Sequence, residues 1–130
     1  MKGLDTNILI RYITCDDESQ AKKVKKLFKE NESLNEKLFV SLAVSLEIMW
    51  VLESGYGLKN DDIIDSLKKL IGLSVLKFEH ESSLLELTIN LEKGDLSDQL
   101  IGIIGKSSGC SSTITFDKAA SKLETFELLK

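Results

Sequence analysis

Short segments typical of β-strands alternate along this chain with longer segments that have helical periodicity. The strand-like segments are residues 2–4, 38–41, 74–78 and 112–115, with a weaker one near Phe126, and the helical patterns cover residues 7–13, 18–29, 42–53, 61–71, 82–92 and 96–106. Because strands that alternate with helices usually pair in parallel, this order predicts an α/β fold around a mainly parallel sheet.

The length and composition indicate a globular protein with one core. The chain has 130 residues, of which 42% are hydrophobic and 29% are charged. These values are typical of globular proteins and not of disordered or membrane proteins, so we expect a single domain over residues 1–130. No apolar run approaches the roughly 20 residues that cross a bilayer. Asp5 interrupts the apolar stretch that a secretory signal needs, so we expect a cytoplasmic location.

The charge distribution limits how the chain can contact nucleic acid. Its formal net charge of −4 argues against binding by overall electrostatic attraction, so any such contact must be local. One basic run interleaves with apolar residues at helical spacing and comprises Lys22, Lys23, Lys25, Lys26 and Lys29. We interpret it as a solvated helix face, with a patch for the RNA backbone as the alternative.

Acidic residues stand at the junctions between the predicted elements. Asp5 follows the first strand and Asp117 follows the fourth. Ligands of open parallel sheets bind beyond the carboxyl ends of the strands, so both side chains should point into one crevice. Asp98 begins the last long helix, with Asp95 one turn before it on the same side. For Asp5, Asp95 or Asp117 alone, a helix N-cap is the simpler interpretation.

Glu47 has an unusual helical environment. Its neighbours one turn away are one alanine, two valines and one tryptophan, and none of them can pair with a charge. We therefore expect Glu47 on a buried apolar face. An unpaired buried carboxylate is costly and usually takes a proton, a partner or a metal ion. A reach to Arg11 or to a lysine from a partly buried position is the alternative.

Four groups of residues, in this order, are similar to a known family. They are Leu4-Asp5-Thr6-Asn7-Ile8-Leu9-Ile10-Arg11-Tyr12; Val40-Ser41 with Glu47-Ile48-Met49-Trp50-Val51-Leu52; Gly94-Asp95-Leu96-Ser97-Asp98; and Gly109-Cys110 with Thr115-Phe116-Asp117-Lys118. The chain resembles the PIN-domain nucleases, and within them the VapC-type toxins of prokaryotic toxin–antitoxin pairs.

The resemblance implies a fold, a site and partners. The implied fold has three α/β/α layers around a central, mainly parallel sheet of four to five strands. The implied activity is endoribonuclease cleavage of RNA by a homodimer that a cognate antitoxin blocks. The implied catalytic residues are Asp5, Glu47, Asp98 and Asp117, with Asp95 as an accessory and Asn7, Thr6, Thr115 and Arg11 positioning the substrate or the acids.

So many carboxylates in one crevice require a counterion. They repel one another unless they are protonated or neutralised, and ligation by oxygen atoms alone suits Mg²⁺ or Mn²⁺. We expect Asp5 and Asp98 as the principal metal ligands, with Glu47 and Asp117 completing the site. The single histidine, His80, lies outside these segments, so the sequence gives no support to a histidine-based mechanism.

The sequence departs from the family pattern in two ways. Leu96 stands where the family usually has an aromatic residue, and Gly102 and Gly105 stand where alanine is commoner. The two glycines predict close packing, for example at a dimer interface.

One alternative function is RNA maturation without a toxin role. The other is a catalytically silent PIN-like binding module, against which the four acids argue.

Overall fold

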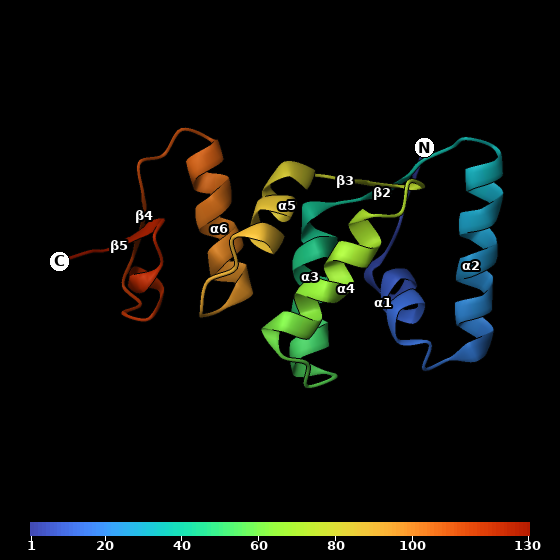
Figure 1. Cartoon of the computed structure of the whole chain (residues 1–130), viewed down its shortest axis with the longest axis horizontal. Helices are drawn as coiled ribbons and strands as arrows, with labels where there is room; N and C mark the ends of the chain where they lie inside the picture. The colour runs from blue at the N-terminus through green and yellow to red at the C-terminus, as the bar shows by residue number, and fades with distance from the viewer. The chain divides into compact units, whose positions relative to one another are not determined.

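A computed structural model describes residues 1–130, which form two compact units (Figure 1). The N-terminal unit is Met1–Glu79 and the C-terminal unit is His80–Lys130. None of their helices is both long and apolar enough to span a membrane. The expectation of a single domain over the whole chain stays a prediction.

The N-terminal unit contains a three-stranded parallel sheet in the order β1-β2-β3. The strands are β1 (Lys2–Gly3), β2 (Leu38–Val40) and β3 (Leu76–Phe78), and the helices between them are α1 (Thr6–Thr14), α2 (Glu18–Ser33), α3 (Leu42–Ser54) and α4 (Asn60–Ile71). The connections from β1 to β2 and from β2 to β3 step in the same direction across the sheet. Because such connections are right-handed, their helices lie on the same face of the sheet. There α1 packs against α2 and α3, and α3 packs against α4.

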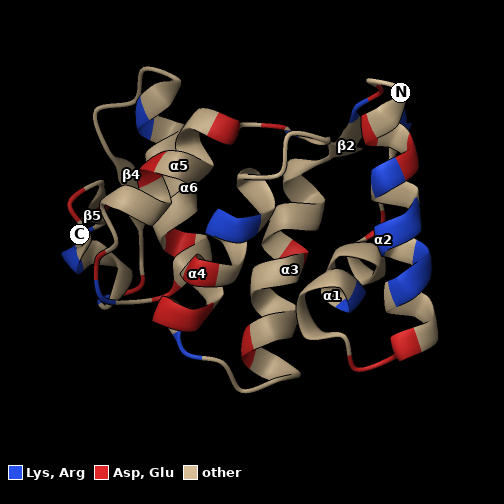
Figure 2. Ribbon diagram, turned by 45° about the vertical axis from the view of Figure 1, so that its right-hand side comes forward, with Lys and Arg blue, Asp and Glu red and all other residues tan.

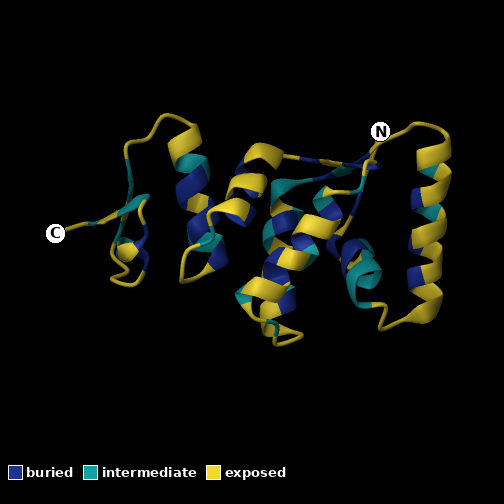
Figure 3. Cartoon of the chain, viewed as in Figure 1, coloured by how far each residue is buried: buried dark blue, intermediate teal, exposed yellow.

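Side chains along the strands of this unit alternate between its core and its outer surface. Leu38 and Val40 of β2 and Phe78 of β3 are buried, whereas Lys77, the register partner of Phe39, is exposed. Along the helices, buried and exposed positions likewise alternate (Figure 3). The helix predicted over residues 61–71 carries an apolar stripe: Ile63, Ile64, Leu67 and Leu70 are buried, and Ile71 is half-buried. Burial of this stripe fixes the face of α4 that meets the rest of the unit.

The C-terminal unit combines two helices with a small sheet. Its elements are α5 (Glu81–Ile89), α6 (Leu96–Ser107), β4 (Thr113–Thr115), the 3-10 helix η1 (Ala120–Lys122) and β5 (Phe126–Leu128). α5 packs against α6, and β4 pairs in parallel with β5. The close packing expected at Gly102 is confirmed inside this unit, because a Cβ atom there would lie 1.9 Å from Thr125 Oγ1 and 2.8 Å from Phe126 Cε1.

The α/β class and the parallel pairing agree with the sequence prediction, but the arrangement of the sheet differs. The five strands form one sheet of three strands and one of two, where one central sheet was expected. Each strand has only two or three residues. A pattern that short predicts a strand without specifying its neighbour, because so few side chains distinguish one pairing from another.

Candidate metal centre

Three of the predicted acids come together in the C-terminal unit, around Asp98. Asp95 is the N-cap of α6, and its Oδ1 accepts a hydrogen bond of 2.9 Å from the backbone N–H of Asp98. Asp98 itself is half-buried. Burial, followed by the negative charges of Asp95 and Asp117, raises the pKa of Asp98. Asp95 and Asp117 therefore lie close enough to Asp98 for their charges to act on its carboxyl group.

Asp117 is held by the turn that leads from β4 into η1. Its Oδ1 accepts from the backbone N–H groups of Ala119 at 2.8 Å and Ala120 at 3.3 Å, and its own N–H donates to Thr115 Oγ1 at 3.0 Å. Thr115 thus orients the residue that follows the strand. Only one oxygen of the Asp117 carboxylate is used in this way, so the other can serve a ligand.

Asp5 lies at the start of α1 in the N-terminal unit. It is the N-cap of that helix, and its Oδ1 accepts a 2.7 Å hydrogen bond from the backbone N–H of Thr6. Thr6 is buried, whereas Asp5 and Asn7 are exposed. The cap interpretation is therefore confirmed for Asp5 and Asp95. It is wrong for Asp117, which accepts from the turn before η1, whereas Ala119 is the N-cap of that helix. Each of these acids keeps a second oxygen that no protein donor occupies.

The expectation that Glu47 is buried on an apolar face is wrong. Glu47 is exposed, and Trp50 one turn on is 65% exposed, because α3 turns Ser45, Ile48 and Met49 toward the core. Apolar residues surround most of α3, so its sequence does not tell which side faces inward. The opposite face, with Glu47, meets solvent. A carboxylate there can bind a ligand without the cost of a buried charge.

Arg11 forms an ion pair with an acid outside the predicted set and not with Glu47. Its Nη1 lies 3.3 Å from Asp16 Oδ1, and its Nε donates to Gln20 Oε1 at 2.7 Å. Hydrogen bonds from Tyr56 and Thr14, and then the charge of Arg11, hold the pKa of Asp16 below its ordinary range. Arg11 is therefore fixed by Asp16, in the connection between α1 and α2, and by Gln20 of α2.

The donor set suits a hard cation. Asp95, Asp98 and Asp117 offer only carboxylate oxygens, and the repulsion that raises the pKa of Asp98 is the kind that a divalent ion relieves. No three His, Cys, Asp or Glu side chains in either unit are arranged to hold an ion by themselves. Asp5 and Glu47 belong to the N-terminal unit, and their convergence with Asp98 and Asp117 stays a prediction.

Comparison with known proteins identifies the family of this chain. The family model for the PIN domain matches residues 3–125. The chain belongs to the PIN domain family. The matched range includes every predicted acid of this PIN domain, from Asp5 to Asp117. A curated VapC ribonuclease of Aquifex aeolicus (strain VF5) is 27% identical to it over 126 residues, which cover 95% of this chain and 92% of that relative. A comparison with solved structures found no significant match.

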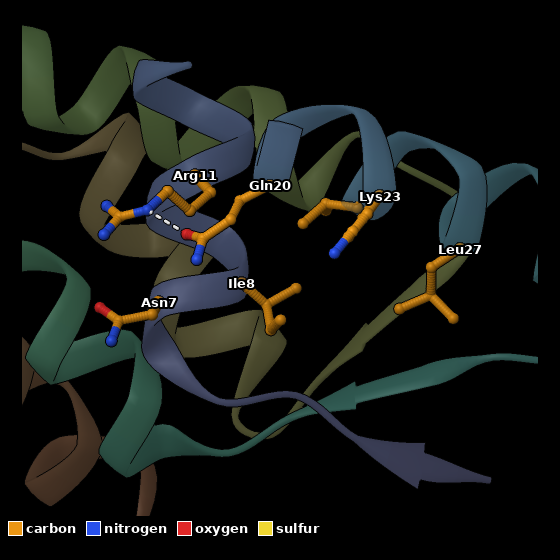
Figure 4. Close-up of a pocket in the computed structure, with 7 residues that line it drawn as sticks. Asn7, Ile8, Arg11, Gln20, Lys23 and Leu27 are labelled. Carbon is orange, nitrogen blue, oxygen red and sulfur yellow. Dashed lines mark hydrogen bonds between the residues drawn. The ribbon is translucent and has the colours of Figure 1, made fainter. Parts of the chain in front are cut away.

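The structure adds a feature that the motifs did not contain, a cavity of about 430 Å³ between α1 and α2 (Figure 4). It begins at Asn7, in the first turn of the helix that Asp5 caps. The sequence did carry a signal for it, because Gln20, Lys23 and Leu27 share one face of α2 at helical spacing. What the sequence lacked was the packing of α1 against that face.

Proposed function

We propose that this PIN domain is a metal-dependent endoribonuclease that hydrolyses phosphodiester bonds in RNA and acts as the toxin of a toxin–antitoxin pair. The observation that carries the proposal is the half-buried Asp98 carboxylate, which the charges of Asp95 and Asp117 reach and which no lysine or arginine pairs with. Membership of the PIN family and similarity to a VapC ribonuclease support the reaction and the toxin role.

We assign Asp5, Glu47, Asp98 and Asp117 to catalysis. Mg²⁺ or Mn²⁺ would be held mainly by Asp5 and Asp98, with Glu47 and Asp117 completing the site and Asp95 as an accessory. Such an ion, when bound, stabilises charge on the phosphate and lowers the pKa of a coordinated water.

The remaining roles belong to residues that fix the acids or the substrate. Thr115 and the N–H groups of the following turn hold Asp117 in one orientation. Thr6 donates its backbone N–H to Asp5. Asn7 and Arg11 follow on α1 and offer hydrogen-bond donors to an RNA strand. These contacts orient carboxylate oxygens before substrate arrives, which is what an electrostatic site needs.

The biological setting is part of the same proposal. By its similarity to a VapC ribonuclease, the chain would act in the cytoplasm as a homodimer of single-domain subunits, and a cognate antitoxin would block it. The net charge of −4 suits an antitoxin that approaches with basic side chains.

RNA cleavage by the purified full chain tests the reaction. We expect cleavage of mixed-sequence RNA with Mg²⁺ or Mn²⁺ and none with chelator. Mutation of a residue that supports a metal ligand typically lowers metal affinity or activity 10- to 100-fold. Asp98→Asn removes a proposed ligand itself, so it should lower cleavage activity at least roughly 100-fold. Asp65→Asn is the matched control, because Asp65 is an exposed acid of α4 outside the motifs. Absence of cleavage by the wild type would show a silent module.

Growth of the expressing cell tests the toxin role separately. Expression of the wild-type chain should arrest growth, and expression of Asp98→Asn at the same protein level should not. An RNA-cleaving wild type that leaves growth unchanged would contradict the toxin role and favour RNA maturation.

A further inference from the structure

The cavity between α1 and α2 has an apolar floor and polar edges. Ile8 of α1 and Leu27 of α2 are half-buried and point into the space between the helices (Figure 4). Val24 also lines the cavity and is 4% exposed. The volume of about 430 Å³ lies within the range of small-ligand sites. Apolar side chains at the floor offer a surface against which a flat ring can pack.

The charge at the cavity is opposite to that of the whole chain. Arg11 and Lys23 line it and no acid does, whereas the chain carries 21 acidic against 17 basic residues. Asp16 offsets the charge of Arg11, but Lys23 is exposed and forms no ion pair. Figure 2 shows that further lysines follow along α2. The local field therefore favours an anion.

Hydrogen-bond donors at the edge remain available. Arg11 uses Nε on Gln20 and Nη1 on Asp16, which leaves other N–H groups of its five free while its plane is fixed. The amide of Asn7 is exposed and has no protein partner. Single-stranded RNA is recognised in this way, by packing of bases and by donors along their edges.

We propose that this cavity binds one nucleotide of single-stranded RNA next to the cleaved phosphate, with its base over Ile8 and Leu27 and its phosphate at Lys23. The inference rests on the proposed function and specifies where the substrate lies. Its position supports it, because the cavity begins at Asn7, in the first turn of the helix that Asp5 caps.

RNA binding by the full chain tests the inference independently of cleavage. The probe is a fluorescently labelled mixed-sequence RNA of single strands, titrated in chelator so that no cleavage occurs. Lys23→Ala should weaken binding about ten-fold, the usual effect of a lost charged hydrogen bond. It should also reduce the slope of log affinity against log salt by about 0.7, the value for one phosphate contact on a single strand. Leu27→Ala, which removes most of one apolar side chain from the floor, should weaken binding without changing that slope.

Lys22→Ala is the matched control. Lys22 is the adjacent exposed lysine of the same helix and lines no cavity, so its removal changes the net charge equally without touching the pocket. The inference would be overturned if Lys22→Ala and Lys23→Ala had the same RNA affinity and the same salt slope. A polypeptide would then be the remaining candidate ligand of the cavity. If cleavage by the wild type persists in that case, the nuclease proposal stands alone.

Photo-crosslinking gives a second readout if a variant fails to fold. RNA that contains 4-thiouridine should crosslink to residues of α1 and α2 that line the cavity in the wild-type chain. Crosslinks confined to the C-terminal unit would contradict the inference. A wild type that neither binds nor cleaves RNA overturns the proposed function and this inference together.

Discussion

At the scale of single residues, the surroundings of Asp98 raise the pKa of its carboxyl group. Its carboxyl group is half-buried beside two other acids, so its proton is held more tightly in the folded protein than in the unfolded chain. Between the two pKa values the folded state binds more protons. This group therefore makes folding less favourable as pH rises from about 4 through its folded pKa.

Titration of the carboxyl carbons by NMR measures this directly. In metal-free protein, the pKa of Asp98 should lie above about 4, and Asp117→Asn should lower it because one repelling charge is gone. Asp65→Asn is the control and should leave it unchanged. Mg²⁺ should lower the same pKa by favouring the ionised form. An Asp98 pKa that Asp117→Asn does not alter would contradict the cluster.

At the scale of elements, the helices were largely predictable and the strands' partners were not. Capping side chains and apolar periodicity mark helix starts, as Asp17 and Ser41 do where they accept backbone N–H groups of α2 and α3. Each predicted helix was found with small shifts at its ends. Strands of two or three residues carry too little pattern to select a neighbour, so the division into two sheets was missed.

The same physical limit explains which parts of the candidate site could be foreseen. Asp5, Asp95 and Asp117 follow from their places at element junctions, where each accepts a hydrogen bond from the backbone; Asp5 and Asp95 are helix caps, and Asp117 holds a turn. The environment of Glu47 was misjudged because a helix that is apolar nearly all round shows no preferred inner face. The cavity beside Arg11 depends on how α1 packs on α2, which local patterns do not contain.

Paired alanine substitutions test the orientation of α3. Met49 is 2% exposed and Trp50 is 65% exposed. Met49→Ala should therefore destabilise the protein by about 2–5 kcal/mol, the usual cost of truncating a buried large side chain. Trp50→Ala should cost less than about 1 kcal/mol, since little of its surface is removed from water. Urea unfolding of both variants gives the comparison, and a larger loss at Trp50 would contradict the assigned face.

At the scale of the whole molecule, the proposed metal site combines acids that are far apart in the sequence. Three of them interact within the C-terminal unit, and Asp5 and Glu47 belong to the N-terminal unit. The PIN family model spans both units without interruption, from residue 3 to residue 125. The central proposal is that Asp5 and Asp98 serve the same metal ion, which makes catalysis depend on the whole chain and not on either unit.

Calorimetric titration of Mn²⁺ into the full chain tests this proposal most directly. We predict that Asp5→Asn and Asp98→Asn each weaken Mn²⁺ binding by more than about ten-fold, as expected for ligands, while Asp65→Asn binds like the wild type. If Asp5→Asn keeps wild-type affinity while Asp98→Asn loses it, the ion belongs to the C-terminal acids alone, and the shared site is contradicted.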